Sequence, residues 1–272
     1  METVTVLMIG DVVGEAGMAL VKERLRPLSL EYGAALTVVN GENAAAGYGL
    51  TEALANEIFD AGADIITSGN HIWEKREFWQ YMDDNERVLR PANYPPQTCG
   101  RGLALIEKAG LSFAVINLQG RKHMTAIDCP FKCFDSIYET LSAGQETAKN
   151  GAAQTGTPPC PIILVDFHAE ASDEKEALGL YIDGRAAVIA GTHTHVQTAD
   201  EKILPHGTAY ITDLGMTGAS GAVIGMKAEP CVSRFVSHIQ ARMECASENP
   251  ALQGIAVKID AANGRSVEIR RI

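Results

Sequence analysis

The sequence predicts an α/β fold in which two β-sheets pack face to face and helices cover both outer faces, a four-layer α-β-β-α sandwich. Short apolar, β-branched runs alternate with segments of helical periodicity along much of the chain. Several of these runs end in polar side chains, as strands of open α/β sheets do beside a ligand site. Neither an internal repeat nor a second core is visible, so residues 1–272 are interpreted as one domain.

Strands and helices alternate in the first third of the chain. Residues 4–10 form an apolar run that predicts a central strand, and a helix is expected at 15–32. The same order is predicted twice more, with strands at 35–39 and 63–68 and helices at 51–61 and 75–85.

The rest of the chain continues the pattern after one interruption. A hairpin is predicted from residues 102–107 and 111–118, around Lys108, Ala109 and Gly110. Segment 121–160 is the least strand-like part and is interpreted as an insertion that holds one helix, 134–147, and a loop, 150–159. The remaining predicted elements are a strand at 161–168, a helix at 172–180, strands at 185–190 and 208–212, and a terminal hairpin of 252–259 and 266–272.

Composition narrows the class of protein. The formal net charge is −11, which argues against general binding of a nucleic-acid backbone but leaves a small phosphorylated substrate open. No apolar run approaches the roughly 20 residues of a membrane helix, and the N-terminus has no signal-peptide pattern. Cys129 and Cys133 could lie one helical turn apart, but no second pair completes a zinc spacing. A cytoplasmic protein with reduced thiols and no membrane contact is therefore expected.

Polar side chains with metal-ligand chemistry follow the predicted strands. His193 and His195 lie two positions apart and would point to the same side of an extended chain, although a solvated strand gives the same pattern. Asp11 could instead cap the following helix, and the Glu42-Asn43 pair could belong to a glycine-assisted turn. The residues collected at strand ends are Asp11, Glu42, Asn43, Asn70, His71, His168, His193 and His195.

The mixture of carboxylate, amide and imidazole groups suits two ions such as Mn, Fe or Zn better than Ca²⁺ or a thiolate zinc site. His71 is expected to be left over, because its side chain should diverge from that of Asn70 on an extended backbone. A histidine just outside the metal shell can protonate a leaving alkoxide; the alternative is a helix-cap or core histidine. Asp166 and Glu170 flank His168 and are candidates to orient imidazoles, unless they are simply solvated carboxylates.

Such a site supports in-line hydrolysis of a phosphate ester. Two metal ions about 3.5–4 Å apart would hold the phosphate oxygens, generate hydroxide from a bridging water at neutral pH and neutralise charge in the transition state. The neutral amide of Asn70 suits a ligand that must also contact phosphate.

These motifs resemble the calcineurin-like metallophosphoesterases. The opening motifs of that superfamily are D-x-H and G-D-x-x-D, and this chain differs from both. Val13 stands in place of the first histidine, and NGEN at residues 40–43 replaces the second motif. In these two differences the chain resembles one branch, the YmdB-type 2',3'-cyclic-nucleotide phosphodiesterases. The segments that look like this branch are GDVVG (10–14), NGENAA (40–45), GNHIW (69–73), DFHAE (166–170), GTHTHVQTAD (191–200) and DLGMTG (213–218).

The resemblance implies a dinuclear site of Fe or Mn, with Glu42 as the bridging carboxylate and His71 as the proton donor. It also implies a homo-oligomer, a dimer or a tetramer. The metal ligands that it implies are Asp11, Glu42, Asn43, Asn70, His168, His193 and His195.

Three functions fit these patterns. The first is a phosphodiesterase that opens 2',3'-cyclic nucleotides, with a metal-bridging hydroxide attacking phosphorus and His71 protonating the leaving oxygen. The second is a phosphomonoesterase or a nuclease acting on RNA ends with the same metals, although a nuclease would need a basic track that the acidic balance disfavours. The third is a metal-dependent regulatory protein that binds a phosphorylated ligand without turnover, for which a proton donor would be unnecessary.

Overall fold

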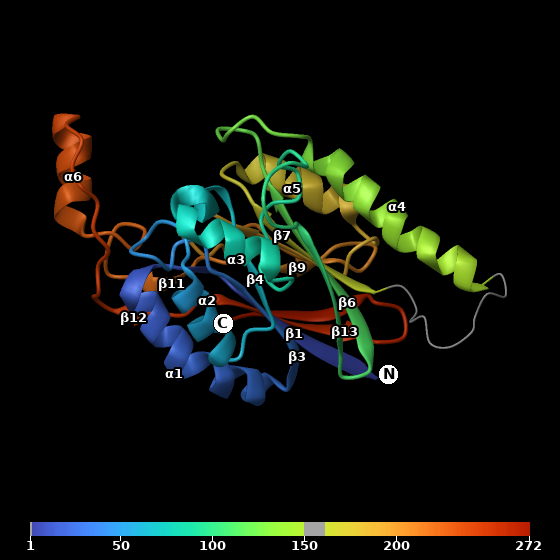
Figure 1. Ribbon diagram of the computed structural model, residues 1–272. Coiled ribbons are helices and arrows are strands. Elements are labelled where there is room, and N and C mark those ends of the chain that lie inside the picture. Colours follow the sequence, from blue (N-terminus) through green and yellow to red (C-terminus); the bar gives the residue numbers. More distant parts are fainter. Residues whose placement is uncertain (1, 150–160) are drawn as a thin grey trace.

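The computed structural model describes residues 2–149 and 161–272, and its two main sheets lie between layers of helices (Figure 1). The strands of the first sheet are β1 (Thr3–Ile9), β3 (Ala34–Asn40), β4 (Ile65–Thr67), β13 (Gly254–Asp260) and β14 (Ser266–Arg271). They lie in the order β14-β13-β1-β3-β4, with β1 parallel to β3 and antiparallel to β13. The predicted C-terminal hairpin therefore completes the sheet that the N-terminus begins.

The second sheet is six-stranded and mostly parallel. Its strands are β5 (Leu103–Lys108), β6 (Leu111–Gln119), β7 (Ile162–His168), β8 (Val188–Thr192), β9 (Lys202–Ile203) and β10 (Ala209–Ile211). They lie in the order β5-β6-β7-β8-β10-β9, and the predicted β5–β6 hairpin is confirmed as an antiparallel pair. β7 and β8 run parallel, so His168 lies opposite Thr192 where both strands end.

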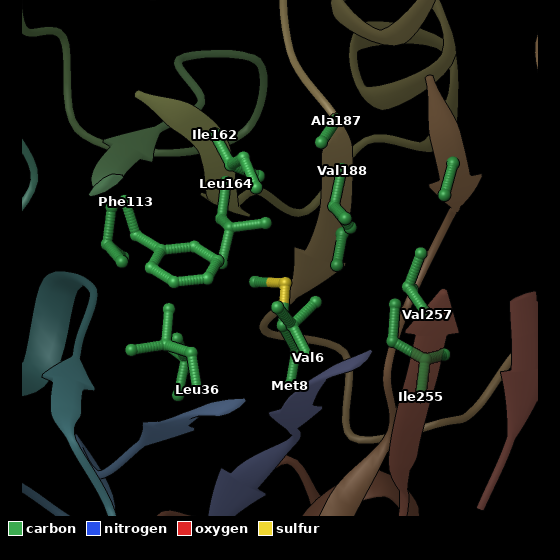
Figure 2. Close-up of a cluster of buried hydrophobic side chains, with 14 of the residues drawn as sticks. Val6, Met8, Leu36, Phe113, Ile162, Leu164, Ala187, Val188, Ile255 and Val257 are labelled. Atoms are coloured by element: carbon green, nitrogen blue, oxygen red, sulfur yellow. The ribbon is translucent and has the colours of Figure 1, made fainter. Parts of the chain in front are cut away.

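The core lies between the two sheets. Val6 and Met8 of β1 belong to the same buried cluster as Phe113 and Leu164 of the second sheet (Figure 2). Alternate residues of these strands point to opposite faces, so each sheet also has an apolar outer face to cover.

Helices cover both outer faces. α1 (Gly14–Tyr32) and α2 (Glu52–Asp60) pack against the first sheet, where Leu25 and Ile58 join one buried cluster with Leu7. α4 (Pro130–Lys149) and α5 (Ser172–Ile182) cover the second sheet, where Phe134 and Leu178 join another. The predicted four-layer sandwich is confirmed.

The expected helix at 75–85 is wrong in its first part. Lys75 is extended, with φ −110° and ψ 97°, and separates the 3-10 turn η1 (Asn70–Glu74) from a second one, η2 (Arg76–Phe78), which leads directly into the short helix α3 (Trp79–Asp84). Helix α2 begins as predicted, because the Thr51 hydroxyl accepts a hydrogen bond from the Leu54 amide. The loop predicted at 150–159 lies outside the described residues.

The small third sheet, the short strand β9 and helix α6 were not predicted. β2 (Asp11–Val12), β11 (Met216–Ala219) and β12 (Pro250–Ala251) form a small third sheet. α6 (Ala228–Ser237) projects from the layers (Figure 1), and Phe235 and Val236 on it are 76% and 78% exposed. Within the described ranges, no helix combines the length and the apolar character that crossing a membrane requires.

Candidate metal centre

The polar residues predicted from the strand ends gather where the two sheets carry their carboxyl ends. Asp11 lies on β2, where it pairs with Met216, so it does not cap α1, whose N-cap is Val13. Glu42 and Asn43 follow β3, and Asn70 follows β4. His168 is the last residue of β7, and His193 follows β8 directly.

His168 is the centre of a first group of residues. Its Nε2 atom lies 2.9 Å from Glu42 Oε1 and 3.0 Å from His193 Nδ1. The same nitrogen lies 3.2 Å from Asn70 Oδ1. The ligand atoms of Glu42, His168 and His193 all lie within 4.8 Å of one another. Four electron-rich atoms from four separate segments therefore face one small volume.

Contacts at Nδ1, on the side of the His168 ring away from Glu42, explain the orientation of the ring. The Thr192 hydroxyl donates to Asp166 Oδ1 over 2.7 Å and lies 2.9 Å from His168 Nδ1. Because that hydroxyl gives its proton to Asp166, it can accept one from Nδ1, which leaves the Nε2 lone pair facing the group. Asp166 is thus connected to the ring through Thr192. Its predicted role of orienting an imidazole is compatible with these contacts.

Glu170 is placed to act on the other histidine. Its Oε2 lies 3.1 Å from His193 Nε2. A proton on Nε2 would bond to this carboxylate and leave the Nδ1 lone pair facing His168. Burial, with repulsion by His168, lowers the pKa of His193 to about 4, so the ring is neutral at pH 7.

A second group consists of Asp11, Asn43 and His195. The Asp11 carboxylate is fully buried, and neither oxygen has a hydrogen-bond partner. His195 Nε2 lies 3.3 Å from Asp11 Oδ2 and 3.2 Å from the Asn43 amide nitrogen. That amide is also 3.3 Å from Glu42 Oε1, so Glu42 lies between the two groups.

The charges and donor atoms of the site fit a metal ion. Burial opposes ionisation of Glu42, but the charge and hydrogen bond of His168 outweigh it and hold the pKa of Glu42 well below its usual range. Burial also opposes protonation of His168, but Glu42, Asp11 and Asp166 raise its pKa. One proton on Nε2 could bond only one of the neighbouring acceptors, whereas a metal ion would accept electron pairs from all of them. The buried Asp11 oxygens, which accept no hydrogen bond, and the mixed nitrogen and oxygen donors thus fit metal ions.

The His71 ring lies outside both groups. Its backbone N–H donates to Glu42 Oε2 over 3.0 Å, while ring atom Nδ1 lies 3.6 Å from Glu74 Oε1. The ring also meets Tyr48 edge to face, with 5.1 Å between centroids. The expected extended backbone is wrong, since Asn70 and His71 start the 3-10 turn η1. Their side chains nevertheless diverge, with Asn70 directed to His168.

A buried ion pair beneath the site was not predicted from the sequence. Lys175 Nζ donates to Asp213 Oδ2 over 2.7 Å and to the Thr192 carbonyl over 2.9 Å. The same Asp213 oxygen accepts from the Thr194 amide, so the pair holds the segment that carries His193 and His195. A signal was present, because Lys175 is spaced as i, i+3 and i+7 with the buried residues Leu178 and Ile182 of α5.

A glycine allows His168 to approach the chain. A Cβ atom on Gly69 would lie 2.1 Å from the imidazole, far closer than nonbonded atoms allow. The residue before Asn70 must therefore lack a side chain, which accounts for the first residue of the GNHIW motif.

The family model described as YmdB-like protein matches residues 7–272. The chain belongs to the YmdB-like family. It is 45% identical to the 2',3'-cyclic-nucleotide 2'-phosphodiesterase of Bacillus subtilis strain 168, over 98% of this chain and 96% of that relative. The family predicted from the motifs is confirmed.

Solved structures agree with this membership. A novel phosphatase from Mycoplasma pneumoniae superposes with a TM-score of 0.89 and 30% identity, over 100% of this chain and 93% of that chain. A putative 5'-nucleotidase from Staphylococcus aureus has a TM-score of 0.62 at 13% identity, over 100% of this chain and 54% of that chain, which is a likeness of fold alone. The YmdB-like chain therefore has a fold of the metallophosphoesterase type.

Proposed function

We propose that this protein is a metal-dependent phosphodiesterase that hydrolyses 2',3'-cyclic nucleotides. The observation that carries the proposal is the convergence of Glu42, His168 and His193 beside the buried pair of Asp11 and His195. The 45% identical relative from Bacillus subtilis, named a 2',3'-cyclic-nucleotide 2'-phosphodiesterase, supports the choice of substrate.

In this proposal the two groups hold one metal ion each and share Glu42. Asn70, His168 and His193 would hold the first ion, and Asp11, Asn43 and His195 the second. Glu42 would serve both, because its Oε1 atom lies 2.9 Å from His168 Nε2 and 3.3 Å from the Asn43 amide nitrogen. A neutral amide at Asn70 leaves room for a phosphate oxygen without adding negative charge.

When bound, the two ions would stabilise charge on the phosphate and activate the attacking water. His71 would supply the proton. Its ring lies apart from both ligand groups but is tied to Glu42 through its own backbone N–H. As the P–O bond breaks, the proton from His71 passes to the leaving ribose oxygen, and water supplies the new P–O bond. Glu74 beside Nδ1 would help to keep the ring oriented.

Iron or manganese is proposed, with zinc as the alternative. All seven proposed ligands offer nitrogen or oxygen, and no thiolate is among them, which suits these borderline ions. Element analysis of protein purified without added metal would identify the ion, and calcium as its main metal would contradict the proposal.

We also propose a cytoplasmic homo-oligomer, a dimer or a tetramer. Five cysteines of the described ranges are free thiols, as expected in a reducing compartment. α6 and the residue after its C-cap expose Val232, Phe235, Val236 and Ile239, between 55% and 78% each, an apolar surface of the kind that a second copy could bury. Light scattering should give a mass above one chain for the wild type and a monomer for Phe235→Asp, and a monomeric wild type would contradict the proposal.

The activity can be tested by incubating metal-analysed protein with 2',3'-cAMP, 3',5'-cAMP and a short RNA, with added Mn²⁺ and with chelator. The proposal expects chelator-sensitive opening of the 2',3'-cyclic ester and much slower turnover of 3',5'-cAMP. Absence of turnover by protein shown to hold two ions would reject it in favour of a phosphate-binding regulatory role.

A further inference from the structure

A cavity of about 440 Å³ has Tyr48, which contacts the His71 ring, in one of its walls. It is bounded on one side by the turn after β3 and on the other by residues 223–246, which we call the α6 arm. Its volume falls in the range of roughly 300–1,000 Å³ that is typical of small-molecule sites. It is lined by Ala46, Tyr48, Arg242, Met243, Glu244 and Cys245.

The first wall is continuous with the reacting groups. Tyr48 meets the His71 ring edge to face, at 76° and 5.1 Å between centroids. The turn that carries Tyr48 begins at the proposed ligand Asn43, whose carbonyl accepts from the Gly47 amide over 3.0 Å. A molecule packed on Tyr48 in the cavity would therefore be connected to the proposed proton donor through that one ring.

The second wall is fixed against the first. Cys245 packs on the turn so closely that a Cβ on Gly47 would lie 2.9 Å from its sulfur. The Glu244 carbonyl accepts from the Lys227 amide over 2.9 Å, which closes the base of the α6 arm. The arm also touches the metal centre, since the Ile224 carbonyl lies 2.9 Å from His195 Nδ1. The cavity thus lies between two segments, the turn after β3 and the α6 arm, each of which contacts the site through one of its residues.

Its lining suits a flat heterocycle. Tyr48 offers an aromatic ring, Met243 a polarisable thioether, and Arg242 a planar cation on an exposed residue. Aromatic rings and guanidinium planes both stack on nucleobases without needing a specific sequence of polar atoms. A phosphate group would instead require several cations, and the Glu244 carboxylate in the lining opposes it.

We propose that this cavity binds the base of the nucleotide whose cyclic phosphate lies at the metal centre, with Tyr48 and Arg242 as residues that determine substrate preference. The inference rests on the proposed function, because it extends the same site away from the phosphate. A purely structural alternative is that Tyr48 only positions His71.

Binding tests the cavity without turnover. The affinities of metal-loaded protein for 3'-AMP and for inorganic phosphate should be measured by calorimetry in wild type, Tyr48→Ala and Tyr48→Phe. Loss of the ring should weaken 3'-AMP binding by about 10- to 100-fold, leave phosphate binding unchanged, and be rescued by Phe. Tyr181→Ala, on α5, is the matched control and should behave as wild type. Unchanged 3'-AMP affinity in Tyr48→Ala would overturn the proposal.

Kinetics separate base binding from positioning of His71. We expect Tyr48→Ala to raise KM for 2',3'-cAMP by about 10- to 100-fold, while hydrolysis of glycerol 1,2-cyclic phosphate, which has no base, stays at the wild-type rate. Arg242→Ala should show a smaller change in the same direction, with Arg24→Ala on α1 as its control. An equal loss of kcat on both substrates would overturn the proposal. Failure of the wild type to hydrolyse either substrate would instead reject the proposed function, and the binding experiment would still decide about the cavity.

Discussion

The two ligand groups of the candidate centre are built in different ways. His168 ends a regular strand, is fully buried, and is connected through Thr192 to the buried carboxylate of Asp166. His195 lies beyond the end of β8, has a φ of 64°, and is held at Nδ1 by the carbonyl of Ile224 on the α6 arm. One histidine is therefore fixed by the sheet and the other by a loop.

This difference indicates how firmly each histidine is held before metal binds. A ligand at a strand end is positioned by the whole β-ladder, so His168 itself should be in place before metal binds, whereas His193, with a φ of 102°, shares the loop segment of His195. The His195 group depends on a loop segment in a sparsely populated conformation, which must be stabilised by its neighbours. The buried Lys175–Asp213 pair supplies part of that stabilisation, because it bonds both ends of the segment 192–194.

The largest effect on metal binding and hydrolysis is expected at Glu42, which lies between the two groups. Glu42→Gln removes the charge that both share, so both ions should be lost and hydrolysis should fall by about 1,000-fold, as for removal of a main electrostatic stabiliser. Element analysis and 2',3'-cAMP turnover measure the two effects. Retention of two ions in full would contradict the bridging role.

His71→Ala should leave both groups intact. We expect two bound ions and a fall in kcat of about 100- to 1,000-fold, the usual contribution of a general acid. The alkaline limb of the pH–rate profile should change as well, because a general acid must carry its proton to act, and a purely structural defect would not produce this change. Undiminished hydrolysis by metal-replete His71→Ala would remove this residue from the reaction.

Lys175→Met tests whether the buried ion pair supports the loop segment that carries His193 and His195. It leaves Asp213 buried and unpaired, so the free energy of unfolding should fall by about 3–5 kcal/mol. Replacing both partners, as in Lys175→Met with Asp213→Leu, should recover part of this loss. Denaturant unfolding measures both variants, and an equally stable single variant would show that the pair does not hold the segment.

Thr192→Val tests whether the Thr192 hydroxyl supports His168 at the end of its strand. Its effect should be the smallest of the four substitutions. Removing the hydroxyl breaks the link between Asp166 and His168, which should weaken metal binding in the His168 group by about 10- to 100-fold. Thr192→Ser should restore it, because the hydroxyl alone is required. Metal titration that shows equal affinities in Thr192→Val and wild type would remove Asp166 from the support of the ring.

The sequence predicted the sandwich and its elements well because strands and helices were long and strongly patterned. The regular strands β1, β7 and β13 show this, since each is an apolar run that a buried sheet explains. The short elements were not predicted, because the 3-10 turns at Asn70 and Arg76 depend on tertiary contacts that produce no periodic pattern in the sequence.

The same distinction applies to the candidate site, where residues at regular strand ends could be predicted and contacts between distant segments could not. Residues at strand ends could be collected from the sequence, since parallel strands carry their carboxyl ends to one edge. The contacts through Thr192 and the Lys175–Asp213 pair could not, because they join segments 17 to 38 residues apart through side-chain hydrogen bonds. Tyr48 was also missed, since nothing in its local pattern places it against His71.

The central claim is that two groups hold one ion each and share Glu42. Mn²⁺ binding to wild type, Asn70→Ala and Asp11→Asn, measured by titration and element analysis on the same samples, tests it most directly. The account predicts two ions in the wild type and one in each variant, with hydrolysis of 2',3'-cAMP lost in both. A single ion in the wild type, or two tightly bound ions in either variant, would contradict it.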